Sequence, residues 1–209
     1  MSIRDAHEAD IDHLIALAST VYRKLPYEHY GSRQAWLEFI QNNHSLVYEE
    51  DRTVIAHGAL EIAKQQGILS RAFVHPNHRE KGIYSALVQR RVEHAQQHAL
   101  EFLETYVATY TDAVQRIMIE HFNFTPAGIK LLDVEDMMNT GQRESLVVLR
   151  RPLSNTSVLP SKKPARLEGY VPVAYDTNGE WRYAPIPSNF DFSKVKLHAA
   201  VKDNLNLDW

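Results

Sequence analysis

The middle of the sequence contains a strand, a helix and a second strand in close succession, and this unit constrains the fold more than any other feature. The run Ile68–Val74 has the composition of a strand and ends before Pro76. Apolar residues then recur at helical spacing over residues 83–99, and Phe102–Ala108 follows as a further strand. Such a unit predicts two parallel strands joined by a right-handed crossover.

The flanking segments predict an antiparallel sheet around this unit. Ser45–Glu50 and Thr53–Ile62 are β-rich runs joined by an acidic turn, which is typical of a hairpin. Asp5 and Glu8 have capping-box spacing ahead of an amphipathic helix that starts near Ile11. The other expected elements are strands at residues 2–5, 124–134 and 145–151 and helices at residues 33–42 and 111–122. The fold class is therefore α/β (α+β), with a mixed, mostly antiparallel central sheet and flanking helices.

The composition changes at Ser154, which predicts a domain boundary. Residues 1–153 form the expected main domain, and residues 154–166, rich in Ser, Pro and Lys without periodicity, form an expected linker. Residues 167–209 form a C-terminal extension in which Asn178-Gly179 lies between two β-rich runs and predicts a hairpin, followed by a short helix within Phe192–Leu205. The extension is too short to form a core easily, so we expect it to pack on the main domain, on a second subunit or on further chain.

Composition argues against several functional classes. The 209-residue chain has no Cys, so disulfides, thiolate metal sites and a Cys nucleophile are not available. We find no signal-peptide core and no run of the ~18 apolar residues that a membrane span needs, so we expect a soluble, cytoplasmic protein with no membrane association. The net charge of −3 argues against general nucleic-acid binding.

The charge is nevertheless unevenly distributed. Five cations and a single acid lie between Arg71 and Arg91, whereas the rest of the chain carries a net charge of −7. A basic segment in an acidic chain indicates either a local anionic ligand or a solvated charged helix face.

The segment Val74–Leu87 connects the first strand of the central unit to its helix through a loop with one glycine. Such a loop directs backbone N–H groups towards a point outside the helix N-terminus, where the helix dipole favours an anion. Gly82 permits a phosphate to approach the backbone, and Arg79 and Lys81 add positive charge. The pattern is neither a P-loop nor a dinucleotide fingerprint, and on chemistry alone an anion site and an ordinary turn both stay open.

This segment resembles the coenzyme A pyrophosphate loop of the GNAT acetyltransferase superfamily, whose pattern is V-x-P-x-x-[RQ]-x-x-G-x-[GA] at a strand-to-helix junction. Val74, Pro76, Arg79 and Gly82 match the pattern, and Tyr84 replaces its final Gly or Ala. The order of elements in the expected main domain also resembles that fold. The resemblance implies that the two central parallel strands splay apart and that the thioester of acetyl-CoA lies in the resulting cleft.

The resemblance also implies which residues bind the cosubstrate. Backbone groups of Phe73 and Val74 would contact the pantetheine arm. The pyrophosphate would be held by Arg79, Glu80, Lys81, Gly82, Ile83, Tyr84 and Ser85.

The two side chains that are most often catalytic in this superfamily are absent. By the resemblance, Ile68 stands at the position of a catalytic Glu, and Ile119 stands where many relatives have a Tyr four residues before a Gly-Phe pair, which is Asn123-Phe124 in this sequence. A substitute base or acid is therefore needed if the reaction uses one.

Three side chains are candidates for that role. Glu61 is the preferred base, because partial burial can raise the pKa of a carboxylate, although a solvated strand-end Glu is the other interpretation. His57, expected to share one strand face with Glu61, Ile55 and Ala59, is either a second base or a core histidine. Tyr106 is either an acid or a structural tyrosine. The pair His94 and His98 has no third ligand, so no metal site is expected.

We therefore expect an N-acyltransferase that moves an acetyl group from acetyl-CoA to a primary amine by direct attack on the thioester, without a metal ion. The acceptor is a small molecule or a peptide, and the negative charge outside the basic segment favours a cationic acceptor such as a lysine or a polyamine. The alternative is a catalytically silent acyl-CoA-binding or regulatory module. A homodimer is one option for its assembly.

Overall fold

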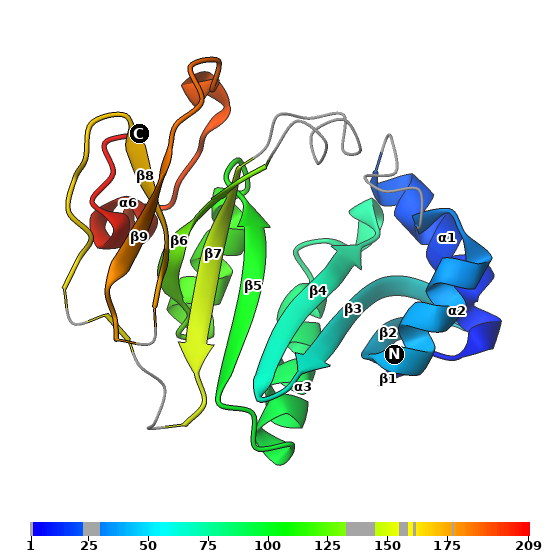
Figure 1. The fold of residues 1–209 in the computed structure, drawn as a ribbon. Coiled ribbons are helices and arrows are strands. Elements are labelled where there is room, and N and C mark those ends of the chain that lie inside the picture. Colours follow the sequence, from blue (N-terminus) through cyan, green and yellow to red (C-terminus); the bar gives the residue numbers. More distant parts are fainter. Residues whose placement is uncertain (1, 23–29, 133–144, 155–158, 161, 177) are drawn as a thin grey trace. The chain divides into compact units, whose positions relative to one another are not determined.

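The computed structural model describes residues 2–22, 30–132, 145–154, 159–160, 162–176 and 178–209 (Figure 1). The chain divides into two compact units, the first ending at Leu100 and the second beginning at Glu101. The boundary that composition suggests at residue 154 stays a prediction. Within the described ranges, none of the helices has both the length and the apolar character needed to cross a membrane.

The first unit is built on four antiparallel strands in the order β1-β2-β3-β4. Its elements are β1 (Ser2–Asp5), η1 (Glu8–Asp10), α1 (Ile11–Val21), α2 (Arg33–Asn42), β2 (His44–Glu50), β3 (Thr53–Ala63), β4 (Gln66–Val74), η3 (Pro76–His78) and α3 (Ile83–Gln97). The expected helices, strands and hairpin are confirmed, and α2 has the bounds that its apolar spacing predicts.

Helices cover both faces of this sheet (Figure 1). On one face, which we call the α1–α2 face, Trp36 of α2 and Leu14 of α1 pack with Phe73 of β4. On the other, the α3 face, Ile83 of α3 packs with Val74 of β4. Because successive residues of a strand point to opposite faces, β4 contributes Phe73 to one core and Val74 to the other.

A β-bulge in β3 changes which face its side chains reach. The register with β2 shifts between Tyr48 and Glu49, which leaves Ile55 as an extra residue of β3. Ile55 therefore packs on the α3 face, whereas Ala59 packs on the α1–α2 face. The expectation that His57 shares a face with both is wrong for Ile55, because a bulge breaks the period-2 alternation on which it depends.

The second unit contains a three-stranded antiparallel sheet, β5-β7-β6, and the hairpin of the extension, β8-β9. Its elements are β5 (Phe102–Ala108), α4 (Asp112–Arg116), the π-helix η4 (Ile117–His121), β6 (Thr125–Leu131), β7 (Ser145–Pro152), β8 (Tyr170–Tyr175), β9 (Trp181–Pro185), η5 (Phe192–Lys194) and α6 (Ala199–Leu205). The helix expected within Phe192–Leu205 is two short helices, and the last two residues of the strand expected at 124–134 lie outside the described residues.

The C-terminal extension packs closely on the rest of the second unit. A Cβ at Gly128 of β6 would lie 2.3 Å from the carbonyl oxygen of Val173 in β8, so only glycine permits this approach.

Gln115 of α4 joins the extension to the rest of the second unit and is fully buried. Its Nε2 donates to the carbonyl oxygens of Ala108 and Lys196, each at 3.2 Å, and its Oε1 accepts from the N–H of His198 at 2.9 Å. The N–H of Lys196 also donates to the carbonyl oxygen of Thr109 at 2.8 Å. These bonds make residues 196–198 part of the unit's buried polar structure.

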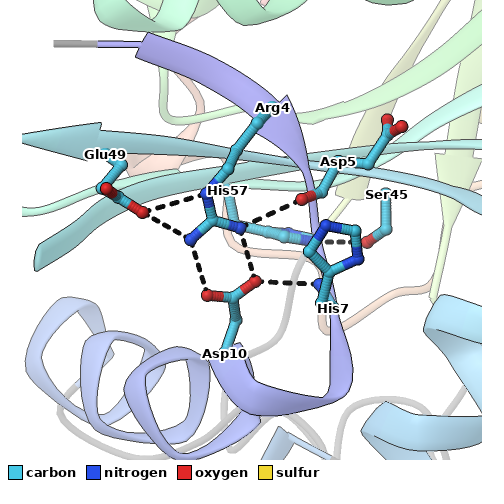
Figure 2. Close-up of polar contacts among 7 residues, drawn as sticks. All are labelled: Arg4, Asp5, His7, Asp10, Ser45, Glu49 and His57. Carbon is cyan, nitrogen blue, oxygen red and sulfur yellow. Dashed lines mark hydrogen bonds and ion pairs between the residues drawn. The ribbon is translucent and has the colours of Figure 1, made fainter. Parts of the chain in front are cut away.

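In the first unit, Arg4 of β1 connects β2 to the start of α1 (Figure 2). Its Nη1 and Nη2 donate to the two Asp10 carboxylate oxygens at 2.7 and 2.8 Å, and its Nε donates to Glu49 at 2.9 Å. Burial alone would raise the pKa of Asp10, but the bonds from Arg4 and from the His7 N–H hold that pKa below its usual value. The acid at the helix start is therefore Asp10, not Glu8 as the spacing from Asp5 suggests.

Replacing Arg4 with Met should lower the free energy of unfolding by about 2–3 kcal/mol at pH 7, because it leaves the buried Asp10 carboxylate without its partner. The usual pKa of Asp10 is 3.8 and its folded-state pKa is lower, so this contribution is present above about pH 4 and is lost as the pH falls further. Urea unfolding at pH 7 and pH 3 measures both effects.

Arg33→Met is the matched control, because Arg33 forms surface ion pairs with Glu8 and Asp12. It should cost less than about 1 kcal/mol. Equal losses in the two variants would contradict the role given to Arg4.

Candidate active site

The loop between β4 and α3 is stabilised by its own backbone and leaves the helix start open. The N–H of His75 donates to the carbonyl oxygen of Ile55 at 2.8 Å, and the N–H of His78 donates to that of His75 at 2.9 Å. Gly82 is the N-cap of α3, and no side chain caps this helix. The first turn of an α-helix has N–H groups without intrahelical acceptors, so an external anion can be bound there.

Gly82 provides the space that such an anion needs. Its φ of 75° is in the left-handed region, and a Cβ at this position would meet no atom within 4 Å. The neighbouring cations Arg79 and Lys81 are exposed. His78 Nδ1 lies 2.9 Å from a carboxylate oxygen of Glu50, which connects the loop to the end of β2. The loop therefore fits a pyrophosphate, and the individual cosubstrate contacts stay predictions.

Tyr84, the departure from the family pattern, faces a buried arginine of its own helix. Burial raises the pKa of Tyr84, and the Arg91 charge partly offsets this. Arg91 is 1% exposed, and it donates to the carbonyl oxygens of Leu87 and Ala59 at 3.0 and 3.1 Å, which connects α3 to β3. A Cβ at Gly58 would lie 3.0 Å from Arg91 Cζ, so the guanidinium occupies the space that this glycine leaves.

The five cations of the basic segment do not form one basic surface. Arg91 is buried in the core, Arg71 is stacked on aromatic rings, and Arg90 forms a surface ion pair on α3. Arg79 and Lys81 are the two that lie in the loop. The charge count in the sequence therefore overstates the positive charge available to a ligand at this loop.

A second β-bulge lies in β4, directly before the residues predicted to contact pantetheine. The register with β3 shifts after the pair His57↔Phe73, and Arg71 has a φ of 46°. His57 Nδ1 lies 2.7 Å from the carbonyl oxygen of Arg71, which can only accept, so Nδ1 carries the proton. His57 Nε2 then accepts from the Ser45 hydroxyl at 2.8 Å, a contact that Figure 2 also shows.

These contacts favour the core interpretation of His57 over its role as a base. The side chain is fully buried with both ring nitrogens in use, and burial lowers its pKa to about 3. Its contribution to the site is to hold the bulge of β4 in place.

The other two candidate catalytic residues, Glu61 and Tyr106, differ in their exposure and in their hydrogen bonds. Glu61 is partly exposed near the end of β3, two residues beyond Ala59 and hence on the α1–α2 face. Tyr106 lies in the second unit, where its hydroxyl donates to Glu104 at 2.5 Å. Burial and this bond raise the pKa of Tyr106, which makes it a weaker acid than an ordinary tyrosine. Glu61 stays the preferred candidate base.

The residues that follow α4 and η4 have conformations consistent with the Gly-Phe pair of the family pattern. Asn123, at the position of the usual Gly, has a φ of 54°, a left-handed conformation that Gly and Asn adopt most readily. Phe124 is 1% exposed. Ile119, which the resemblance places at the position of the usual Tyr, lies in the π-helix η4 and offers no proton donor.

The described residues contain no group of three or more His, Asp or Glu side chains that could hold a metal ion. The His94 and His98 rings stack on each other at 4.1 Å between centroids, and His94 stacks on His44 at 3.5 Å. The three imidazole rings contact one another through their faces, so their nitrogen atoms are not directed at a common metal position.

A family model described as the acetyltransferase (GNAT) family matches residues 11–124, which include the loop and more than half of the chain. The chain belongs to the GNAT acetyltransferase family. The general reaction of the GNAT family is transfer of an acetyl group from acetyl-CoA. No curated protein matches the sequence significantly.

Solved N-acetyltransferases share the fold. An N-acetyltransferase from Staphylococcus aureus Mu50 is 20% identical with a TM-score of 0.60, over 73% of this chain and 98% of its own. The ribosomal-protein-S18-alanine N-acetyltransferase from Escherichia coli is 14% identical with a TM-score of 0.59, over 73% of this chain and 94% of its own. The PaiA N-acetyltransferase from Thermoplasma acidophilum, in complex with coenzyme A, is 17% identical with a TM-score of 0.55, over 72% and 98%. The expected GNAT-like fold class, with a mainly antiparallel sheet and flanking helices, is confirmed for this GNAT protein.

Replacing His57 with Leu should destabilise the protein by about 2–4 kcal/mol at pH 7.5, because the Arg71 carbonyl and the Ser45 hydroxyl lose a buried partner. The folded-state pKa of His57 is about 3 and its usual value is 6.5, so its contribution is complete above pH 6.5 and is lost as the pH falls towards 3. The stability difference between the wild type and His57→Leu should therefore shrink between pH 7.5 and pH 4.5 in denaturant titrations.

His13→Leu is the control, because His13 is exposed on α1. Its stability difference from the wild type should be small throughout. A His57→Leu deficit that does not change with pH would contradict a neutral, buried His57.

Proposed function

We propose that this acetyltransferase moves the acetyl group of acetyl-CoA to a primary amine by direct attack on the thioester. The observation that carries the proposal is the open start of α3, where left-handed Gly82 leaves room for a phosphate in a sequence that matches the coenzyme A loop. The amine class is supported by relatives of the same fold that are ribosomal-protein-alanine N-acetyltransferases.

Each part of the cosubstrate has a counterpart in the first unit. The pyrophosphate is bound by the loop and the first turn of α3, with Arg79 and Lys81 as counter-charges. The pantetheine arm is bound by backbone groups of Phe73 and Val74, whose positions follow from the bulge that His57 holds. A backbone N–H of this pair is the proposed donor to the oxyanion that develops on the thioester carbonyl.

The acceptor needs help to lose a proton. An amine with a pKa of ~10.4 is neutral in about one molecule in a few thousand at pH 7. Glu61 is the proposed base, directly or through water. The leaving thiolate, with a pKa of ~8.5, needs little acid assistance, so the raised pKa of Tyr106 is no obstacle to the reaction.

The alternative function is a silent acyl-CoA-binding module. It is motivated by Ile68 and Ile119 at the two usual catalytic positions. Thiol release over a panel of amines separates the two, because a module binds acetyl-CoA and releases no thiol. The cytoplasmic location and a homodimeric assembly stay predictions.

Gly82→Glu should weaken acetyl-CoA binding at least about 100-fold, because it places a side chain and a negative charge in the phosphate position. Isothermal titration calorimetry with acetyl-CoA measures this. Gly169→Glu is a closely matched control, because Gly169 has the same φ of 75° and also has no atom within 4 Å of a Cβ. The two variants introduce the same backbone strain, and unchanged affinity in Gly82→Glu would show that the loop is not the cosubstrate site.

Glu61→Gln should lower kcat for amine acetylation about 100-fold at pH 7, and less at pH 9.5, where more of the amine is already neutral. Thiol release at saturating acetyl-CoA measures kcat, and acetyl-CoA affinity should not change. Glu38→Gln, an exposed change on α2, is the control. A pH-independent loss, or the same loss in both variants, would exclude Glu61 as the base.

A further inference from the structure

Arg71 is a partly buried cation within an apolar strand. Its guanidinium lies over the ring of Phe39, with Cζ 3.5 Å from the centroid, and it lies 5.1 and 5.4 Å from the ring centroids of Trp36 and Tyr30. Stacking on rings leaves the N–H groups of a guanidinium directed outwards in its own plane, where they can form a fork. The aromatic rings therefore hold the guanidinium in a fixed orientation.

None of these N–H groups is used within the described part of the chain. Nη1 is buried and has no hydrogen-bond partner there, and the guanidinium donates to no described side chain or carbonyl group. Glu61 acts on Arg71 only as a nearby charge, which partly offsets the effect of burial on the Arg71 pKa. A buried guanidinium N–H without an acceptor is costly, so a ligand that supplies an acceptor would be favoured at this position.

Three other arginines that are at least partly buried have acceptors, although Arg91 Nη2 also lacks a partner among the described residues. Arg91 donates to two carbonyl oxygens. Arg150 donates to Glu104 at 2.7 Å, and Arg4 donates to two carboxylates. Arg71 differs from all three, because no described residue supplies an acceptor to its guanidinium.

The position of Arg71 associates it with the acceptor and not with coenzyme A. Its side chain lies on the α1–α2 face with Phe73, and both contact Tyr30 and Trp36. The start of α3, where the phosphates are proposed to bind, packs on the opposite face with Val74. Arg71 also lies two residues before Phe73, at the bulge that sets the backbone proposed to face the thioester.

We propose that the amine acceptor carries a carboxylate close to its amino group, as an amino acid does, and that Arg71 is the residue that binds this carboxylate. This inference rests on the proposed function and names the class of its acceptor. Glu61, on the same face, then attracts the ammonium group at the other end of the acceptor. The net charge of the chain favours a cationic acceptor, but the unpaired cation beside the strand favours one that also carries a negative charge.

The direct test compares α-amino acids with their carboxamides, which lack the carboxylate, as acceptors in the thiol-release assay. The wild type should show a KM about 10- to 100-fold lower for the amino acids, the effect of one charge-assisted fork. A dipeptide, whose carboxylate lies further from its amine, is a third arm that separates amino acids from peptides. Equal KM values for amino acids and amides would overturn the proposal.

Substitutions at Arg71 test whether this residue causes the difference in KM between amino acids and their carboxamides. Arg71→Met should raise KM for the amino acids by the same 10- to 100-fold and leave KM for the amides and for acetyl-CoA unchanged. Arg71→Lys should retain part of the preference, because a lysine keeps the charge and loses the planar fork. Arg182→Met, an exposed change on β9, is the control. An equal rise for acids and amides in Arg71→Met would indicate a merely structural role and overturn the assignment.

A binding measurement separates this inference from the proposed function. An amino acid titrated calorimetrically into wild-type protein saturated with coenzyme A should bind, its amide should bind at least about 10-fold more weakly, and Arg71→Met should remove the difference. Carboxylate-dependent binding without acetylation of any amine would support the Arg71 site and refute the proposed reaction. Acetylation without a carboxylate preference would support the reaction and refute the Arg71 site.

Discussion

The hydrogen bond from His57 to the carbonyl oxygen of Arg71 is the interaction on which the site depends. It spans β3 and β4 at the bulge, inside the core, and burial keeps the imidazole neutral, so that Nε2 can accept from the Ser45 hydroxyl at the same time. The bulge directs the Arg71 side chain onto the aromatic rings of α2 and sets the faces of the two residues that follow. Phe73 reaches one core, Val74 reaches the other, and the loop to α3 begins after Val74.

The two faces of the first sheet serve different parts of the proposed reaction. The α3 face carries the phosphate loop. Tyr84, the residue of this loop that departs from the family pattern, is accommodated by the packing of that face. Tyr84 packs against the core of this face, and Arg91 fills the space above Gly58. On the α1–α2 face lie the Glu61 carboxylate and the Arg71 guanidinium, whose Nη1 has no partner among the described residues. An acyl donor and a zwitterionic acceptor can thus be recognised by separate sets of side chains, which allows either to change without the other.

The sequence is sufficient to predict the regular elements and the strand-to-helix junction at Gly82, whereas the cosubstrate role of that loop stays a prediction. The apolar spacing of Arg33–Asn42 predicts α2, because an amphipathic helix has a strict period, and Gly82 is identifiable from its place in the family pattern. The bulges were not predictable, because one extra residue in a strand leaves no compositional mark. Strict alternation therefore places Ile55 on the wrong face, and composition alone does not distinguish Arg71 from the other cations of the basic segment. A lone arginine among apolar strand residues was the available signal.

The contacts of Gln115 have a consequence for the order in which the chain folds during translation. The acceptor and donor groups that complete its hydrogen bonds come 81 and 83 residues later in the sequence. A ribosome releases the whole first unit, including the phosphate loop, well before it releases those groups. Until residue 198 has emerged, the Gln115 amide has its local acceptor at Ala108 and otherwise only water, so this part of the nascent second unit is completed last and is accessible to chaperones and proteases in the meantime.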